Sequence, residues 1–368
     1  MKPIRLNINT KSQKYPIFIG SNLLNKIQKF IKKDLSQFEK CLLVVDKKVP
    51  NKNISQIKKS IQCKNIYILY FRANEKNKNQ KSVDKILKIL LDKNFSRSDC
   101  LIAIGGGITG DVVGFAASVF KRGLQFINVP TSLLAQVDSS IGGKTGINTT
   151  YGKNLVGSFY QPKLVIADCT FLQTLPKREI ICGYAEILKH SLISNKIFFN
   201  FLRKNFIQIV SLKSPFIERA IYESCKIKKK IVEKDENEKN LRKNLNFGHT
   251  FAHAYEASLK YSKKLNHGEA VLLGIRSALK FSLNKKFLKK NEYMSIIDHY
   301  KKSKLPSNLK KYFYIKDINK IVNFMSKDKK NKTNKINLIL LKKIGLTSIK
   351  EEFDKKFLIN FLKNELND

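Results

Sequence analysis

The chain changes its hydrophobic period near residue 175, and this change limits the folds open to it. Before that point, short apolar runs such as CLLVVD at 41–46 alternate with amphipathic stretches such as QKSVDKILKILLDKNF at 80–95. After it, from EIICGYAEILKHSLI at 179–193 onward, nearly every segment has helical spacing, and only KINLILL near 335 indicates a further strand. Strands that alternate with helices favour a mostly parallel sheet. We therefore expect an α/β domain over 1–175 and an all-α domain over 176–368.

Length and composition agree with two ordinary globular domains. The chain has 368 residues, which exceeds the size at which single cores usually stop growing, and 42% of them are hydrophobic. No run reaches the roughly 18 apolar residues of a membrane helix, and the N-terminal MKPIRLNINTKSQK has no apolar signal segment. The six cysteines form no CxxC pair. Reduced thiols and a cytoplasmic location are expected.

The net charge of +42 raises nucleic-acid binding as an alternative function. The lysines, however, are spread over every surface-like segment, often beside asparagine and isoleucine, and they form no single basic stripe. Specific nucleic-acid binding is therefore not expected. The positive field should still attract anionic small molecules such as phosphate esters.

Three glycines stand between an apolar strand and a helix in IAIGGGITGD at 102–111. Gly105, Gly107 and Gly110 match the G-x-G-x-x-G spacing that brings backbone N–H groups up to a phosphate. The alternative is a tight turn that binds no ligand. A dinucleotide site usually has an acid about 20 residues further on, but none occurs between 121 and 138, so Asp46 becomes the candidate for the ribose.

Three of the five histidines, His249, His253 and His267, fall within nineteen positions, and Glu186 lies upstream in the apolar stretch GYAEILKH. Two imidazoles and a carboxylate are the ligands of many catalytic zinc ions. Spacing alone favours His249 with His253, which share a helix face, but HTFAH lacks the glutamate of HExxH. Glu186 has His190 four residues on, so spacing does not decide the ligands. Buried structural histidines remain the alternative.

Charged and hydroxyl side chains also gather in VPTSLLAQVDSSIGGKTGINTTYGKN at 129–154. Asp138, Lys144, Lys153 and Asn154 stand here in an otherwise apolar neighbourhood. Lysines bind phosphate or carboxylate, whereas aspartate and asparagine bind hydroxyls. The segment is typical of a loop that binds a polyhydroxylated anion.

Several sequence blocks in this order resemble the 3-dehydroquinate synthase family, which catalyses the second step of the shikimate pathway leading to chorismate and the aromatic amino acids. The blocks are GGGITGD, FKRGLQFINVPTSLLAQVDSSIGGKTGIN, GKNLVGSFYQP, TLPKREI, GYAEILKH, NFGHTFAHA and HGEA. The resemblance implies a dehydroquinate synthase-like fold with an NAD-binding α/β domain and a helical metal-binding domain. It also implies an active site in the cleft between these domains, and a homodimer.

The resemblance further implies a role for individual residues. The metal, zinc or cobalt, would be held by Glu186, His249 and His267, with His253 beside it as a substrate or proton-transfer residue. The positions that would bind NAD are Asp46, Glu75, Lys78, Gly106, Gly107, Asp111, Thr131, Ser132, Lys153, Thr174 and Leu175. The positions that would meet the substrate are Asp138, Lys144, Asn154, Lys189, Lys228, Arg242, Asn246 and either Lys329 or Lys330, and Arg122 would reach the substrate of the neighbouring subunit.

The activity implied is that of a phosphorus–oxygen lyase. It would convert 3-deoxy-D-arabino-heptulosonate 7-phosphate to 3-dehydroquinate and phosphate through transient oxidation by NAD, elimination of phosphate, re-reduction and an intramolecular aldol closure. A related sugar phosphate cyclase and a metal-dependent polyol dehydrogenase are the alternatives within the enzyme class. Lys144, Asn154, Lys228 and Arg242 suit a substrate that carries both a carboxylate and a phosphate.

The chain departs from the usual family residues at a few positions. Asn74 stands where glycine is usual in the nucleotide block, and the fit of this loop depends on whether it needs a positive φ. Ser132 replaces a threonine and keeps the hydroxyl, and His190 replaces a tyrosine near the expected metal site. The lysine-rich stretch at 326–335 is expected to be a solvated loop, or a lid that orders on a ligand.

Overall fold

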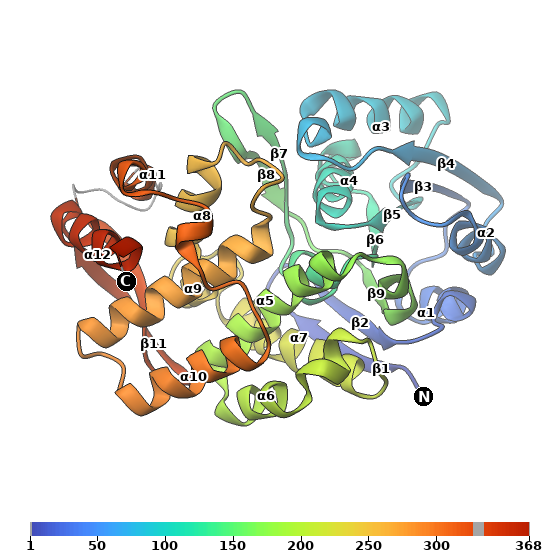
Figure 1. The fold of residues 1–368 in the computed structure, drawn as a ribbon. Coiled ribbons are helices and arrows are strands. Elements are labelled where there is room, and N and C mark those ends of the chain that lie inside the picture. Colours follow the sequence, from blue (N-terminus) through green and yellow to red (C-terminus); the bar gives the residue numbers. More distant parts are fainter. Residues whose placement is uncertain (1, 327–334, 368) are drawn as a thin grey trace. The chain divides into compact units, whose positions relative to one another are not determined.

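The computed structural model describes residues 2–326 and 335–367, except for the side chains of 349 and 350. The chain divides into two compact units (Figure 1). The first unit comprises Met1–Pro176 and Ser214–Asn237, and the second comprises Lys177–Lys213 and Glu238–Asp368. Most of the lysine-rich stretch at 326–335 lies outside the described residues, over 327–334.

The return of residues 214–237 to the first unit was not expected from the sequence. This segment forms helix α7 (Phe216–Lys234), which packs on the strands near the N-terminus. Helical spacing predicts that a helix has a buried face, but it does not say which neighbours cover that face. The first crossing between the units follows Pro176, one residue after the expected domain boundary.

The first unit is built on a seven-stranded sheet in the order β1-β2-β9-β6-β5-β3-β4. Only the pair β1 and β2 is antiparallel, and the other neighbouring strands run parallel. The strands are β1 (Ile4–Asn9), β2 (Lys14–Gly20), β3 (Lys40–Asp46), β4 (Asn65–Phe71), β5 (Cys100–Gly105), β6 (Gln125–Pro130) and β9 (Leu164–Asp168). The helices are α1 (Ile27–Asp34), α2 (Asn51–Ser60), α3 (Gln80–Asp92) and α4 (Gly107–Val119), in addition to α7. The expected α/β architecture is confirmed.

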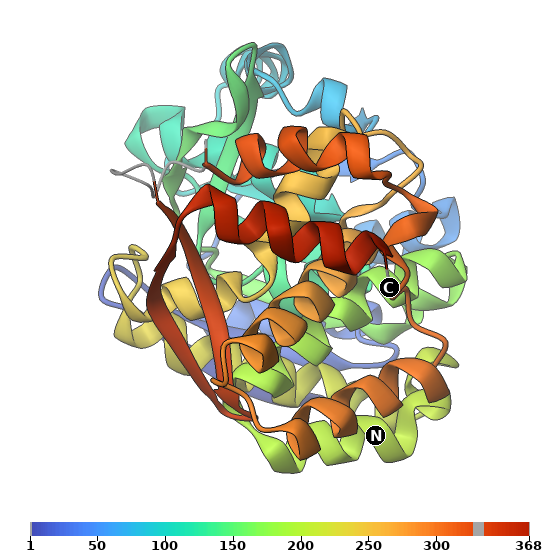
Figure 2. The same cartoon turned by 60° about the vertical axis from the view of Figure 1, so that its left-hand side comes forward.

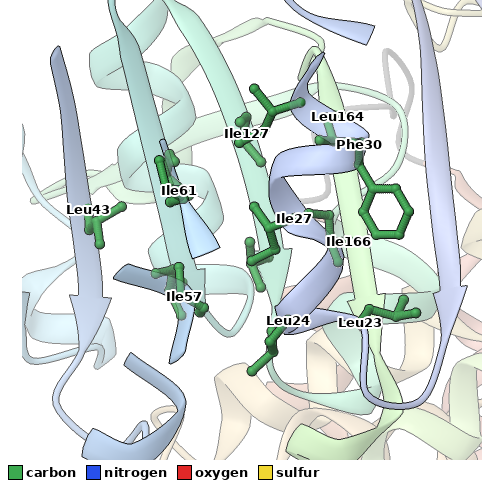
Figure 3. Packing of buried hydrophobic residues seen from close by; sticks show 14 of the residues in the cluster. Leu23, Leu24, Ile27, Phe30, Leu43, Ile57, Ile61, Ile127, Leu164 and Ile166 are labelled. Atoms are coloured by element: carbon green, nitrogen blue, oxygen red, sulfur yellow. The ribbon is translucent and has the colours of Figure 1, made fainter. Parts of the chain in front are cut away.

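Helices cover both faces of this sheet. Alternate residues of each strand point to opposite faces, so neighbouring residues of one strand enter different cores. On β3, Leu43 packs with α1 and α2, whereas Leu42 and Val44 pack with α3 and α4. Figure 3 shows the first of these cores, with Ile57 of α2 and Phe30 of α1 among the residues around the sheet. The continuous apolar runs of the central strands are explained by this double coverage.

The segment 129–154 folds partly as a hairpin, not as the loop expected from its composition. Strands β7 (Lys144–Thr149) and β8 (Gly152–Phe159) pair antiparallel. Two glycines make the close pairing feasible, since a Cβ on Gly157 would lie 2.1 Å from the Thr145 carbonyl oxygen and one on Gly146 would lie 2.6 Å from that of Val156. Composition indicated the polar character of this segment, but the glycines decide its backbone.

The second unit is mainly helical, as expected. Its helices are α5 (Lys177–Ser194), α6 (Lys196–Val210), α8 (His249–Ser258), α9 (His267–Asn284), α10 (Lys290–Lys302), α11 (Ile318–Ser326) and α12 (Lys355–Asn367). The expected strand near 335 is β10 (Ile336–Lys343), and it pairs with β11 (Leu346–Phe353), which was not expected. The hairpin turns at Ile344 and Gly345, where Gly345 has φ 94°, and β10 packs against α9 (Figure 2).

The sequence also predicted reduced cysteines and no membrane-spanning helix. All six cysteines are free thiols, and every one except Cys63 is buried. Among the described helices, none combines the length and apolar character needed to cross a membrane.

The buried carboxylate of Asp168 should be a main determinant of the stability of the first unit. Its oxygens accept hydrogen bonds from the backbone N–H groups of Asn22 (3.1 Å), Leu23 (2.6 Å) and Leu24 (3.2 Å), which follow β2. Asp168→Ala leaves these donors without their acceptor and should lower the free energy of unfolding by about 3 kcal/mol. Urea-induced unfolding measures this loss. The exposed Asp84→Ala is the control and should change stability by less than about 0.5 kcal/mol; equal effects of the two substitutions would contradict the assignment.

Candidate active site

The residues expected to bind a nucleotide follow the carboxyl ends of five parallel strands of the first unit. Asp46 ends β3, Glu75 and Lys78 follow β4, Gly106 follows β5, Thr131 and Ser132 follow β6, and Thr174 and Leu175 follow β9. Because these strands run in the same direction, their carboxyl ends lie at one edge of the sheet. This edge is where open α/β sheets bind ligands.

The glycine turn has both a packing role and an open side. A Cβ on Gly105 would lie 2.4 Å from the Thr109 hydroxyl oxygen, and one on Gly107 would lie 2.9 Å from that of Ser139. Gly105 is therefore required by close packing, whether or not a ligand binds, whereas a side chain at position 107 would have to displace the Ser139 hydroxyl. Gly106 differs, because the nearest atom to its Cβ would be the Ser132 hydroxyl oxygen at 3.5 Å. It stands at the N-terminus of α4, where free backbone N–H groups favour an anion.

Two polar clusters connect the 74–78 loop with α4 and β8. The Lys78 ammonium lies 2.5 Å from the Asp111 carboxylate and donates to the Asn154 amide oxygen at 2.5 Å. Burial raises the pKa of Asp111, although the Lys78 charge opposes this rise. The expected NAD residues on these segments thus contact one another directly.

The second cluster is formed by Glu75. Its carboxylate lies 2.9 Å from the Lys153 ammonium and accepts a hydrogen bond from the Asn148 side chain at 2.8 Å. Burial acts to raise the pKa of Glu75, but the hydrogen bond and charge of Lys153 outweigh it, and the pKa falls below its ordinary value. Glu75 is therefore ionised at neutral pH and can accept hydrogen bonds from ligand hydroxyls.

The departure at Asn74 has no cost in backbone strain. Asn74 has φ −152° and ψ 165°, an extended conformation that any residue adopts. Its side chain accepts a hydrogen bond from the Asn77 N–H at 2.9 Å and so caps the turn that carries Glu75. The loop therefore needs no positive φ at position 74, and asparagine fits there as well as glycine.

The other expected substrate residues of the first unit lie on different elements. Lys228 of α7 donates to the carboxylate of Asp138 at 2.7 Å and to its backbone carbonyl at 2.5 Å. Lys144 begins β7 and is exposed. Arg122 is also exposed and has φ 65°, directly after Lys121 with φ 47°. Two successive left-handed non-glycine residues carry a conformational cost, which is typical of functional segments.

Three donor atoms meet in the second unit. Glu186 of α5, His249 of α8 and His267 of α9 each offer one ligand atom, and these atoms all lie within 4.8 Å of one another. The Glu186 Oε1 atom is 3.5 Å from the His249 Nε2 atom and 3.9 Å from the His267 Nε2 atom. Two ligands of a tetrahedral zinc ion, each bonded at about 2.1 Å, lie roughly 3.4 Å apart. The distances fit a single bound ion.

Hydrogen bonds fix the direction of both imidazoles. The His249 Nδ1 atom lies 3.3 Å from the Phe247 carbonyl oxygen, and the His267 Nδ1 atom lies 3.1 Å from a carboxylate oxygen of Glu256. Because carbonyl and carboxylate oxygens only accept, both Nδ1 atoms carry the hydrogen. Burial, followed by the charge of Lys189, lowers the pKa of His249 well below its ordinary value. Each Nε2 atom therefore presents a lone pair.

The third atom, Glu186 Oε1, is buried and has no hydrogen-bond donor among the described residues, while Oε2 pairs with the Lys189 ammonium. Three acceptor atoms, from the buried Glu186 and His249 and the partly exposed His267, thus lie within 4.8 Å of one another. Such an arrangement repels itself unless a cation lies between the atoms. The residues fit a divalent metal ion.

Close helix packing brings these donors together. Helix α9 packs against both α5 and α8. A Cβ on Gly268 would lie 2.2 Å from the Cys182 Cα atom of α5, and one on Gly274 would lie 2.3 Å from the Gly248 carbonyl oxygen before α8. Only glycine allows backbones to approach this closely. The glycine of the HGEA block therefore sets the position of His267.

The remaining expected residues of the second unit lie on α5, on α8 and in the segment Leu241–Asn246 that precedes α8. His190 is fully buried on α5, and the His253 ring centroid lies 5.3 Å from that of His249 on α8. Arg242 is buried, and the Asn246 side chain donates to the Glu238 carboxylate at 2.7 Å. The pairing of His249 with His253 favoured by spacing does not occur in the three-donor group. Lys329 and Lys330 lie outside the described residues.

Residues in two sequence blocks also have roles that were not expected from the sequence. Arg178, in TLPKREI, donates to the Glu269 carboxylate of the HGEA block at 2.8 Å and to the carbonyls of Lys263 (3.0 Å) and Lys264 (3.2 Å). Glu269 also forms a capping box with Asn266 at the start of α9. The S/T/D/N-x-x-E pattern in NHGE was the available signal for this cap.

The sequence matches two family models over most of its length. The model described as "3-dehydroquinate synthase N-terminal" matches residues 68–182, and the one described as "3-dehydroquinate synthase C-terminal" matches residues 183–331. A curated 3-dehydroquinate synthase of Pelagibacter ubique (strain HTCC1062) is 60% identical over 363 residues, which cover 99% of each chain.

Two solved structures have similar folds. A 2-deoxy-scyllo-inosose synthase complexed with carbaglucose-6-phosphate, NAD+ and Co2+ is 25% identical, with a TM-score of 0.86 over 98% of this chain and 99% of that chain. ValA, a 2-epi-5-epi-valiolone synthase from Streptomyces hygroscopicus subsp. jinggangensis 5008 with NAD+ and Zn2+ bound, is 22% identical, with a TM-score of 0.85 over 98% of both chains. The likeness to ValA concerns the fold alone. The fold class expected from the sequence is confirmed.

Substitution of Gly268 tests the link between helix packing and the donor group. In Gly268→Ala, the new Cβ meets the backbone of Cys182, so α9 must shift and carry His267 away from Glu186. We expect a loss of about 1–3 kcal/mol in stability together with weaker zinc binding. Thermal unfolding and zinc titration measure the two effects. Gly20→Ala is the control, because its Cβ would meet no atom closer than 3.5 Å; wild-type zinc affinity in Gly268→Ala would refute the link.

Proposed function

The chain belongs to the 3-dehydroquinate synthase family, and we propose on this basis that it converts 3-deoxy-D-arabino-heptulosonate 7-phosphate to 3-dehydroquinate and inorganic phosphate. It would act as a phosphorus–oxygen lyase that depends on NAD and on one divalent metal ion. The observation that carries the proposal is the convergence of three donor atoms, from the buried Glu186 and His249 and the partly exposed His267, in a chain that the family matches in both halves.

The family match favours this reaction over those of the related cyclases. The relative with the proposed activity is 60% identical, whereas the 2-deoxy-scyllo-inosose synthase of similar fold is 25% identical. The basic residues Lys144, Lys228 and Arg242 also suit a substrate with a carboxylate as well as a phosphate. These observations favour a sugar acid phosphate as the substrate.

The proposed metal ligands are Glu186, His249 and His267. A carboxylate with two neutral imidazoles suits zinc or cobalt and leaves a coordination position for the substrate. A divalent ion bound there would supply a Lewis acid, which lowers the pKa of a hydroxyl that it contacts. The Lys189 ammonium, paired with Glu186, adds positive charge beside the same carboxylate and suits a substrate anion or alkoxide.

The proposed NAD site lies at the carboxyl edge of the parallel strands. Asp46 and Glu75 would accept hydrogen bonds from ribose hydroxyls, and the N-terminus of α4 at Gly106 and Gly107 would bind the pyrophosphate. Asp111, Lys153, Thr131, Ser132, Thr174 and Leu175 would complete the site, with Lys78. NAD bound there would accept one hydride and return it in each turnover, so the net reaction would show no redox change.

The other polar residues would bind and orient the substrate. Lys144 and Asn154 would contact its phosphate, and Arg242 its carboxylate. Lys228 donates to the Asp138 carboxylate at 2.7 Å, which would orient that carboxylate as an acceptor for a substrate hydroxyl. His253 would relay a proton to or from the substrate.

We further propose a homodimer in which Arg122 reaches the substrate of the partner subunit. The support is the conformation of the chain at Lys121 and Arg122, where the two residues with positive φ present an exposed guanidinium. The cytoplasm is the proposed location, since all six cysteines are free thiols, as is usual in a reducing compartment.

Removal of the metal and of NAD tests the chemistry. Release of inorganic phosphate from the heptulosonate phosphate should stop after thorough dialysis against EDTA and return when Zn2+ or Co2+ is added. It should also require NAD, while NADH remains far below the amount of product. Activity that survives complete metal removal would defeat the metal proposal. Net formation of one NADH per product would indicate a dehydrogenase, and polyanion binding without any phosphate release would indicate the nucleic-acid alternative.

Mixed dimers test the role of Arg122. Arg122→Ala and Lys144→Ala should each be inactive, but a heterodimer of the two contains one complete site if Arg122 acts across the subunits. Random reassortment of equal amounts should restore about a quarter of the wild-type activity. The phosphate assay measures this recovery after the variants are mixed, with each variant alone as the control. Absence of recovery, when heterodimers are demonstrated by differently tagged subunits, would refute the cross-subunit role.

A further inference from the structure

The three donor residues differ in how firmly the protein holds them. The side chains of Glu186 and His249 are 1% and 11% exposed, whereas that of His267 is 34% exposed. His267 is also the first residue of α9, where the helix has no preceding turn to pack the side chain. Its orientation therefore depends more on individual contacts than that of the other two.

One contact that orients His267 comes from a different helix. Glu256 lies on α8, and its carboxylate accepts a hydrogen bond from the His267 Nδ1 atom at 3.1 Å. The Glu256 side chain is 10% exposed, so the carboxylate lies in surroundings where a hydrogen bond to it is strong. Glu256 shares α8 with His249, and the same helix therefore supplies one ligand and supports another.

The corresponding support for His249 is a backbone group. Its Nδ1 atom faces the Phe247 carbonyl at 3.3 Å, which no side-chain substitution removes. For His267, the same task falls to a side chain. The hydrogen bond of His267 can therefore be removed by substituting Glu256, while all three donor residues of the proposed site stay in place.

We propose that Glu256 is a positioning residue that fixes the tautomer and direction of His267, so that its Nε2 atom is held ready for the metal ion. The carboxylate keeps the hydrogen on Nδ1 and leaves the lone pair on Nε2, 3.9 Å from Glu186 Oε1. It also makes the imidazole more basic and thus a stronger ligand. This inference rests on the proposed metal site.

Zinc affinity of the full-length protein tests the proposal. The protein is freed of metal, and the Kd for Zn2+ is measured by competition with a chromophoric chelator, with inorganic Zn2+ as the probe. Glu256→Gln, which keeps the shape but loses the charge, should weaken binding about tenfold, and Glu256→Ala about a hundredfold. The absorption spectrum of the Co2+-loaded protein should change in both variants, because the geometry around the ion changes.

The control is another buried glutamate of the same unit. Glu365 of α12 is 2.7 Å from Arg276 of α9, and its side chain is 2% exposed. Glu365→Gln should lower thermal stability but leave the zinc Kd and the Co2+ spectrum at their wild-type values. It thus measures the effect of losing a buried carboxylate charge that contacts α9 at Arg276, without touching His267.

The outcomes separate this inference from the proposed function. If the wild-type protein binds no zinc, the metal site itself is refuted. If the wild-type protein binds zinc and both Glu256 variants bind it equally well, only the role of Glu256 is refuted. That role is also refuted if Glu365→Gln weakens binding as much as Glu256→Gln, since the effect would then come from general loss of stability.

Discussion

The mutual repulsion of three electron pairs is the constraint on which the second unit depends. Glu186 Oε1 and the Nε2 atoms of His249 and His267 lie close together, with the first two side chains buried and His267 partly exposed, although none of these atoms can donate a hydrogen bond to another. Burial of such groups is costly unless a cation balances them. The folding energy of the surrounding helices must therefore hold the three donor atoms together, and such preorganisation is what the proposed metal site requires.

Very close contacts between helices hold the three donor residues in place. Gly268 and Gly274 bring α9 to within backbone contact of the segments that carry the other two donor residues, Glu186 and His249. The capping box of Asn266 and Glu269 begins α9 at His267. Arg178 joins Glu269 to the carbonyls of the preceding loop, which fixes the entry of the chain into the helix. The TLPKREI and HGEA blocks thus contact each other through Arg178 and Glu269, and together they fix the start of α9.

In the first unit, the fold brings polar residues from several loops to one edge of the sheet. Its parallel strands deliver polar residues to one edge, and the loops there are joined to each other by the contacts of Lys78 with Asp111 and of Glu75 with Lys153. Such contacts hold flexible side chains near the conformations in which they can bind a ligand. Gly105 serves close packing against Thr109, whereas the phosphate-binding role proposed for the turn rests on the backbone of Gly106 and Gly107 at the start of α4.

The sequence by itself determined the two architectures, the strand-to-helix glycine turn and the polar character of segment 129–154, because these depend on local spacing and composition. The family resemblance added the grouping of Glu186 with His249 and His267. Spacing could not supply this grouping, since histidines 63 and 81 residues after Glu186 in the sequence meet it only through helix packing. Tertiary structure alone decided that α7 returns to the first unit, that β11 pairs with β10 and that Glu256 supports His267. In each case the arrangement is stabilised by contacts between segments that are distant in the sequence. The residue pattern within one segment does not show which other segment it will contact.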